Sequence, residues 1–347
     1  MKNLLLLKNN TWILLGLILF LALFLRFYQL GSFPVGFQMD EASKGYTAYS
    51  LLKTGRDDNG HAFPLYIDIF GDNSPSGYHV ITIVPVAFFG LTEFAVRSPG
   101  ALFGALTVIA LFFLTLSIFE NKKLSLLSAL ILAISPWHIN LSRASSESLV
   151  ALFLIVTGFA LVIWSLKKES LRELGIGTIV LALSFLFYQT PRLFVPLLFL
   201  TLVVFFVFIW KKELSKPFKK LLVIAFLCLS LFDACLIFAI PGGTGRFSQV
   251  NIFSYPETKL VMDEAIREDG VQHTPTVVTR IFHNKIVDNS YAYFSNYLEY
   301  FSWTFLFMKG LPSTYFVPQM GVMYAVELPF VLIGVLYLVF SKKHVEK

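Results

Sequence analysis

The fold is decided near the N-terminus, where TWILLGLILFLALFLRFYQL at residues 11–30 is followed by GFQMDEASKGYTAYSLLKTG at residues 36–55. The first segment is apolar over about 20 residues, the length that a helix needs to cross a bilayer. The second segment carries two adjacent carboxylates, Asp40 and Glu41, soon after that span. The sequence thus places a pair of acids at a membrane surface, and their purpose has to be explained.

The segment around the two acids has a helical pattern. Four residues recur at spacings of three and four: Ala42, Tyr46, Tyr49 and Leu52. This stripe predicts a helix that lies in the membrane interface with its tyrosines at headgroup depth. Asp40 stands where the N-cap of that helix is expected, so backbone N–H groups would bind its carboxylate. An ordinary helix cap explains Asp40 as well as a functional role does.

Composition identifies the class of protein. The 347-residue chain is 56% hydrophobic and 14% charged, whereas soluble proteins carry about 25% charged residues. We therefore expect an all-α polytopic membrane protein. The net charge of +6 does not indicate nucleic-acid binding, because the basic residues fall mostly at the ends of apolar segments. The two cysteines, Cys228 and Cys235, share one apolar segment, which excludes a disulfide framework or a zinc site.

The basic residues predict the topology. Eight spans are expected: 11–30, 98–119, 123–141, 148–166, 174–189, 193–210, 220–241 and 324–341. Short segments at their ends hold more than half of the Lys and Arg residues. Short loops rich in these residues stay in the cytoplasm. We therefore predict a plasma-membrane protein whose N-terminus is cytoplasmic and whose site lies on the outer face. The outward loops are then 31–97, 142–147, 189–192 and 242–323.

One apolar segment does not fit a simple crossing. YHVITIVPVAFFGL at 78–91 is short, and Pro85 interrupts it. A single crossing here would move every later Lys-rich loop to the outside. We therefore expect an interfacial or re-entrant helix at this position.

Three arginines and a third acid lie at the outer ends of the predicted spans. Arg97 begins the second span, Arg143 and Glu147 lie in SRASSESL, and Arg192 lies in YQTPRLF. Guanidinium groups suit phosphate, and carboxylates suit a metal ion or proton abstraction. Snorkelling to the interface explains each arginine taken alone. Because all of them share a side with the Asp-Glu pair, a common site is favoured.

The order of these motifs resembles the GT-C glycosyltransferases, specifically the group of the protein O-mannosyltransferases and the lipid A aminoarabinose transferases. The resemblance is carried by the Asp-Glu pair with GYTAYSLLKTGRD, by GYHVITIVPVAFFGLTEFAVRSPGALFGALTV, and by AISPWHINLSRASSESL. The late NYLEYFSWTFLFMKG and GVMYAVELPFVLIGVLY are similar to the bacterial branch. The resemblance implies a GT-C fold and inverting transfer of a sugar from a polyprenyl-phosphate donor. The sugar and the acceptor (a protein, a lipid or a polysaccharide) stay open.

The resemblance also implies residue roles. Asp40 matches the catalytic base of the first outer loop, with Glu41 and Glu147 as further catalytic acids. The arginines assigned to the donor phosphate are Arg97, which matches the family, and Arg143 and Arg192, which we add on charge alone. No nucleotide cofactor is implied, and participation of a divalent metal ion is left open.

The chain departs from the family before the 78–91 segment. The aminoarabinose-transferase group has a Glu-Lys pair there and the protein mannosyltransferases have a His-Pro-Pro stretch, whereas this chain reads GDNSPSGYHV. Asp72 and His79 are the residues left to complete that part of the site. Asp233, within LCLSLFDACLIF, is an acid inside a span and so a functional candidate by default, although it is not in the proposed catalytic set.

Three regions are expected: a transmembrane core at 1–241, an outer region at 242–323, and a last span with a cytoplasmic tail at 324–347. Two other functions compete with transfer. A lipid-linked-sugar flippase or transporter would be expected to show internal repeats and charges at the midplane. A non-catalytic membrane partner would keep the GT-C fold without activity.

Overall fold

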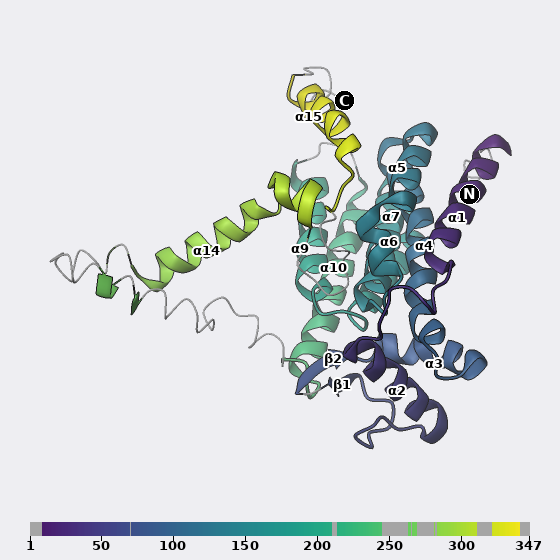
Figure 1. Cartoon of the computed structure of the whole chain (residues 1–347). Coiled ribbons are helices and arrows are strands. Elements are labelled where there is room, and N and C mark those ends of the chain that lie inside the picture. Colours follow the sequence, from purple (N-terminus) through teal and green to yellow (C-terminus); the bar gives the residue numbers. More distant parts are fainter. Residues whose placement is uncertain are drawn as a thin grey trace. The chain divides into compact units, whose positions relative to one another are not determined.

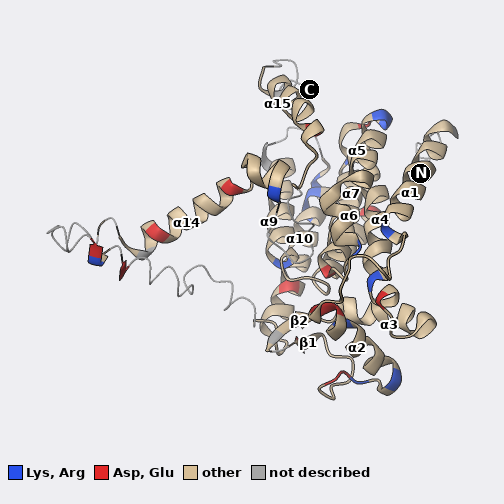
Figure 2. Ribbon diagram, viewed as in Figure 1, with Lys and Arg blue, Asp and Glu red and all other residues tan. Residues whose placement is uncertain are grey.

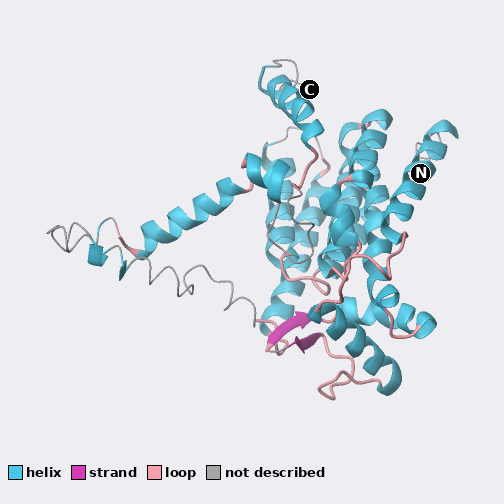
Figure 3. Cartoon of the chain, in the orientation of Figure 1, coloured by secondary structure: helices cyan, strands magenta, loops and turns pink. Residues whose placement is uncertain are grey.

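The computed structural model describes residues 9–69, 71–209, 214–244, 263–264, 266–268, 281, 283–310 and 321–340. These residues are mostly helical (Figure 3). They fall into two compact units, divided between Gly243 and Thr244. The Lys-rich chain ends at 1–8 and 341–347 lie outside the described residues.

The first unit is a bundle whose long helices stand side by side (Figure 1). They are α1 (Asn9–Phe27), α4 (Glu93–Phe119), α5 (Lys122–Ile134), α7 (Glu147–Lys168), α8 (Leu171–Ser184), α9 (Pro191–Val204) and α10 (Lys216–Phe238). A short π-helix at Phe205–Ile209 follows α9. Among the described residues, α1, α4, α7 and α10 are long and apolar enough to cross a membrane. The predicted helical membrane bundle is confirmed, whereas the count of eight spans is not.

The predicted span at 123–141 is bent rather than straight. It consists of α5 and the short α6 (Pro136–Ser142), which meet at 59° and together could form a fifth span. Pro136 cannot continue the hydrogen bonding of α5, so carbonyl groups at its end are left open. The buried guanidinium of Arg26 on α1 binds two of these, Leu132 O at 3.3 Å and Ala133 O at 3.1 Å. The bend is therefore held by an arginine from the first span.

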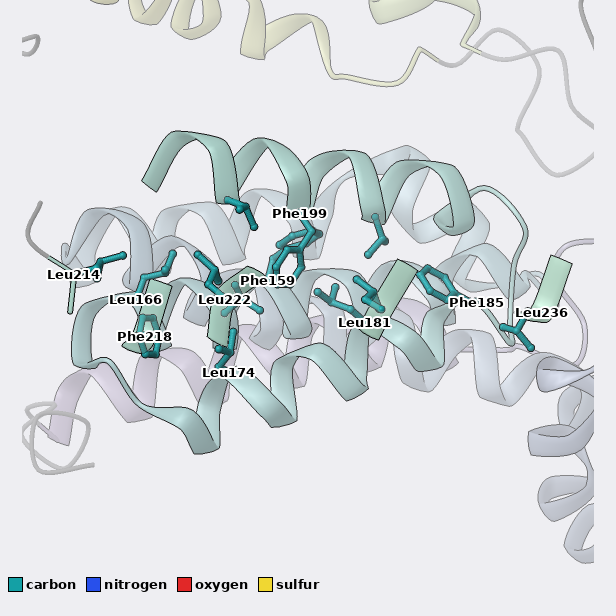
Figure 4. Close-up of a cluster of buried hydrophobic side chains, with 14 residues drawn as sticks. Phe159, Leu166, Leu174, Leu181, Phe185, Phe199, Leu214, Phe218, Leu222 and Leu236 are labelled. Carbon is teal, nitrogen blue, oxygen red and sulfur yellow. The ribbon is translucent and has the colours of Figure 1, made fainter. Parts of the chain in front are cut away.

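Apolar side chains pack the interior between α7, α8, α9 and α10 (Figure 4). Each helix contributes, for example through Phe159, Leu181, Phe199 and Leu222, all of which are buried. Other helix faces expose large apolar side chains, as expected for faces that contact lipid. The bundle supplies a rigid base for the polar residues at one of its ends.

A layer of short elements covers that end of the bundle (Figure 1). It contains α2 (Met39–Thr54), the antiparallel strands β1 (Tyr66–Ile69) and β2 (Asp72–Pro75), and α3 (Gly77–Phe89). We call it the outer layer. The sequence predicted the interfacial helix α2 but not the hairpin. At 13 residues α3 is only about 20 Å long, which is too short for a simple crossing.

The outer layer rests on the turns that connect α6 with α7 and α8 with α9. Lys44 Nζ donates to Ser145 O at 2.7 Å, and Gly77 N donates to Leu186 O at 3.0 Å. The lysines that begin α5 lie at the opposite end of the bundle (Figure 2). The chain therefore enters and leaves the outer layer on one side, in agreement with a 78–91 helix that makes no net crossing.

The second unit contains α14 (Lys285–Glu299), a short π-helix at Thr304–Lys309, a 3-10 helix at Ala325–Glu327 and α15 (Leu328–Phe340). Met323 N donates to Leu306 O at 2.7 Å, which connects the segment before α15 to the π-helix at Thr304–Lys309. The apolar α15 occupies the position of the predicted last span and is shorter than a full crossing requires.

Candidate functional site

Arg97, near the start of α4, is fully buried and holds the loop after α1 in place. Its Nε donates to Glu41 Oε1 at 3.0 Å and its Nη2 donates to Glu41 Oε2 at 2.8 Å, a two-point ion pair between α4 and α2. Its other bonds, at 2.7–3.3 Å, go to oxygens of Leu30, Pro34, Gly36 and Glu93. The guanidinium is thus directed at protein acceptors around its whole edge.

Glu41 is 1% exposed, and both of its oxygens accept hydrogen bonds. Besides the two from Arg97, Oε1 accepts from Ser145 N at 3.1 Å and Oε2 accepts from Gln38 N at 3.4 Å. The bond to Gln38 belongs to a capping box, in which the third helical residue binds the N-cap backbone. The N-cap of α2 is therefore Gln38, and the prediction that Asp40 caps this helix is wrong, because Glu41 supplies the capping carboxylate.

Asp40 is the second residue of α2, and its side chain is exposed. It sits between the Gln38 cap and the buried Glu41, so its backbone is fixed on both sides. The two adjacent acids therefore point in different directions: Glu41 into the protein and Asp40 out of it.

Glu147, the first residue of α7, forms an ion pair with Lys44 of α2. Lys44 is 3% exposed, and its Nζ also lies 5.3 Å from the centroid of the Tyr78 ring. Sequence reasoning predicted Glu147 and missed Lys44. The available signal was its spacing, because Lys44 lies three residues after Glu41 and so shares the buried face of the helix. We call Glu41, Arg97, Lys44 and Glu147 the ion-pair cluster.

Arg143, which follows α6, is directed at the end of α1. Its Nη1 donates to Leu25 O at 3.0 Å and to Arg26 O at 3.3 Å, and its Nη2 donates to Phe33 O at 3.1 Å. A cation at the C-terminus of a helix binds its unpaired carbonyls and stabilises its dipole. Partial burial, and then the charge of Arg97, lower the pKa of Arg143. This guanidinium is half-buried, unlike that of Arg97.

Arg192 lies apart from the ion-pair cluster, at the start of α9. Its Nη2 donates to Phe185 O at 3.0 Å, and its guanidinium lies 5.0 Å from the centroid of the Tyr66 ring. Tyr66 Oη donates to Leu236 O of α10 at 3.0 Å. Burial raises the pKa of Tyr66, Arg192 opposes that rise and Asp233 adds to it. Arg192, Asp233 and Tyr66 therefore form a second polar group, which we call the α9–α10 cluster.

Two further predicted residues belong to the hairpin and α3. His79 is buried, and neither ring nitrogen has a hydrogen-bond partner. Burial, and then the charge of Lys44, lower its pKa to about 3, so the imidazole beside Lys44 is neutral at physiological pH. The backbone of Asp72 pairs with Ile69 in the hairpin, and its side chain lies outside the described atoms.

The buried Glu41 and its neighbour Glu147 do not fit a metal site. Within the described ranges, no three His, Cys, Asp or Glu side chains are grouped so as to hold an ion. Glu41 accepts from Arg97 and Glu147 accepts from Lys44, so both are engaged with cations of the protein.

Comparison with known proteins agrees with the fold. Residues 72–238 match the model of the dolichyl-phosphate-mannose-protein mannosyltransferase family. No curated protein matched the sequence. A structure of the Archaeoglobus fulgidus oligosaccharyltransferase in complex with Zn and sulfate has a TM-score of 0.56 and 12% identity, over 94% of this chain and 43% of that one.

A second structure of that enzyme, tethered with an acceptor peptide containing the NVT sequon, has a TM-score of 0.53 and 11% identity, over 96% of this chain and 38% of that one. The chain thus spans less than half of the length of the enzyme it matches. It has the GT-C fold, and its core resembles the protein mannosyltransferase family, as the order of motifs predicted.

Proposed function

We propose that this protein is a membrane glycosyltransferase that moves a sugar from a polyprenyl-phosphate donor to an acceptor hydroxyl on the outer face of the plasma membrane. The GT-C fold and the family match over 72–238 support this class of reaction. One observation carries the assignment of the site. The exposed Asp40 stands on a backbone that its buried neighbour Glu41 fixes through Arg97.

The reaction is a single displacement. The acceptor hydroxyl attacks the anomeric carbon while Asp40 accepts its proton, and the bond from that carbon to the phosphate oxygen breaks. The lipid phosphate leaves with the electron pair of that bond. Because attack and departure take place on opposite faces of the carbon, the configuration inverts. A carboxylate held in one place lowers the cost of positioning it against the acceptor.

The remaining residues take three roles. Arg97 and Glu41 position α2 and with it Asp40. Glu147, held by Lys44, orients the acceptor beside Asp40. Arg143 offsets the charge on the departing phosphate, because its guanidinium is only half-buried at the end of the bundle that carries the outer layer.

The family description favours mannose as the sugar and a protein hydroxyl as the acceptor. Transfer is tested with purified full-length protein, radiolabelled mannosyl phosphoryl polyprenol and three acceptors: a Ser/Thr-rich peptide, a lipid and a polysaccharide. Label in any acceptor supports the proposal. If the labelled donor moves across the membrane of vesicles that contain the protein, and no sugar is transferred to an acceptor, the protein is a flippase. The same assays are repeated with glucosyl, galactosyl and aminoarabinosyl donors. If no donor crosses the membrane and no sugar is transferred from any of them, the protein is a non-catalytic partner.

A further inference from the structure

The α9–α10 cluster contains two buried polar atoms that lack hydrogen-bond partners. They are Arg192 Nε and Asp233 Oδ1, on side chains that are 4% and 6% exposed. Arg192 is the second residue of α9, and Asp233 lies on α10 shortly before that helix ends. Both therefore lie toward the end of the bundle that carries the outer layer. Buried polar groups without partners are rare in folded proteins, and each requires an explanation.

The two side chains do not satisfy each other. The Arg192 guanidinium lies 5.0 Å from the centroid of the Tyr66 ring, and Asp233 also affects the Tyr66 hydroxyl, yet no ion pair within 4.0 Å joins Arg192 to Asp233 in the described structure. Arg192 uses Nη2 on Phe185 O, and Tyr66 Oη donates to Leu236 O. The Tyr66 hydroxyl interacts with the Arg192 side chain and donates its only proton to Leu236 O, so it has no proton left for Asp233 Oδ1.

The chemistry of the two atoms restricts what could bridge them. The Nε–H group of arginine can only donate a hydrogen bond, and a carboxylate oxygen can only accept one. A phosphate oxygen would satisfy Arg192 and be repelled by Asp233. A hydroxyl group accepts from Arg192 with its oxygen and donates its proton to Asp233, so it satisfies both.

We propose that Arg192 and Asp233 bind a hydroxyl group of the sugar on the donor lipid. This inference rests on the proposed function, and it replaces the phosphate role that charge alone assigned to Arg192. It assigns Asp233, the acid inside α10, as a specificity-determining residue. Tyr66 packs over the guanidinium, so the β1–β2 hairpin borders the proposed site.

An ordered water is the competing occupant, because it also donates and accepts. A sugar hydroxyl and a water make different predictions for binding. If a sugar hydroxyl is bound, losing either side chain weakens only probes that carry a sugar. If water alone is bound, neither side chain affects the affinity of any probe.

The test measures the binding of two kinds of probe to full-length protein in nanodiscs. One is farnesyl phosphate, which has no sugar, and the other is farnesyl phosphate linked to mannose, glucose, galactose or aminoarabinose. The variants are Asp233→Leu and Arg192→Gln, with Asp233→Asn and Arg192→Lys in reserve if the first pair does not fold. Cys235→Leu is the control, because Cys235 is exposed on the same helix.

Wild type and Cys235→Leu should bind the preferred sugar probe more tightly than farnesyl phosphate. Asp233→Leu and Arg192→Gln should lose about tenfold in affinity for that sugar probe, the usual effect of a lost hydrogen bond to a charged group. Their affinity for farnesyl phosphate should change less than twofold.

Three results would overturn the proposal. Tighter binding of farnesyl phosphate by Asp233→Leu, with weaker binding by Arg192→Gln, would show a phosphate site. Unchanged affinity of both variants for every probe would show an ordered water only. If wild type itself binds no sugar probe better than farnesyl phosphate and transfers none of the sugars, the proposed function fails first and this inference fails with it.

Discussion

Glu41 and Arg97 face each other across α2 and α4 through two parallel hydrogen bonds, and both are almost completely buried. The bonds fix the rotation of α2 about its own axis relative to α4. Rotation matters here because Asp40 precedes Glu41 by one residue, which is about 100° around a helix. Anchoring Glu41 inward therefore presents Asp40 outward.

Breaking the Glu41–Arg97 pair should destabilise the protein. Glu41→Gln removes the buried charge partner of the buried Arg97, and such losses cost about 3–5 kcal/mol. The matched control is Glu93→Gln, which removes the other carboxylate bonded to Arg97, one that is 40% exposed. Its cost should be about 1 kcal/mol or less. Thermal unfolding of both variants in detergent checks this prediction, and equal effects would contradict it.

Asp40→Asn should abolish sugar transfer while the protein inserts and unfolds like wild type. Removing a general base typically lowers the rate by about 10²–10⁴-fold, and an exposed side chain contributes little to packing. The control is Asp58→Asn, another exposed acid of the outer layer, which accepts a bond from Thr47 Oγ1 at 3.1 Å. Turnover of Asp40→Asn near that of the control would remove Asp40 from the role of base.

Much of the fold could be predicted from hydropathy and from the positions of lysines. Local apolar patterns predicted the first apolar helix and the helix α2, and the count of Lys-rich loops predicts that 78–91 makes no net crossing. These features depend on hydropathy and on the spacing of residues that are close in the chain, so they can be read from short stretches of the sequence.

The contacts of the site could not be predicted in the same way. Arg97 was assigned to phosphate by the resemblance and Arg143 on charge, and neither argument revealed that both donate to protein oxygens. Lys44 pairs with Glu147 from a distant part of the chain. Such pairs depend on how helices pack, which charge alone does not reveal. The hairpin was missed because strands of four residues are too short to show an alternating pattern.

Gly100 of α4 should not tolerate alanine. A Cβ at this position would lie 2.5 Å from Ala144 O, in the turn that also provides the Ser145 bonds to the ion-pair cluster. We expect Gly100→Ala to cost about 1–3 kcal/mol, the usual effect of overpacking. Gly16→Ala is the control, because nothing lies within 4 Å of a Cβ on Gly16 of α1. Equal stability of the two variants in unfolding measurements would contradict the close packing of α4 against this turn.

Cysteine labelling should place α2 and the start of α5 on opposite sides of the membrane. Asn59 follows α2 in the outer layer and Lys122 begins α5, and both are exposed. Each is changed to cysteine in a chain that lacks Cys228 and Cys235. A membrane-impermeant maleimide applied to whole cells should label only Asn59→Cys, and broken cells should label both. Labelling of Lys122→Cys in intact cells would show that the topology is inverted or that α3 crosses the membrane.

His79 should make the protein less stable in acid. Its pKa is about 3 in the folded protein because of burial and Lys44, and about 6.5 when unfolded. A depressed histidine pKa means that the unfolded chain binds the proton first, so stability falls as the pH decreases from 6.5 toward 3. At pH 5 the loss due to this residue is about 2 kcal/mol relative to pH 7.5.

The replacement His79→Phe removes the titrating group and keeps a ring of similar shape. Because neither ring nitrogen has a hydrogen-bond partner, the variant gives up no hydrogen bond of the described structure. Its unfolding free energy should fall less than that of wild type between pH 7.5 and pH 5, by about 2 kcal/mol. His61→Phe is the control, since His61 is exposed in the outer layer. Parallel pH curves for wild type and His79→Phe would mean that His79 is solvated, and the packing of α3 against α2 would then need revision.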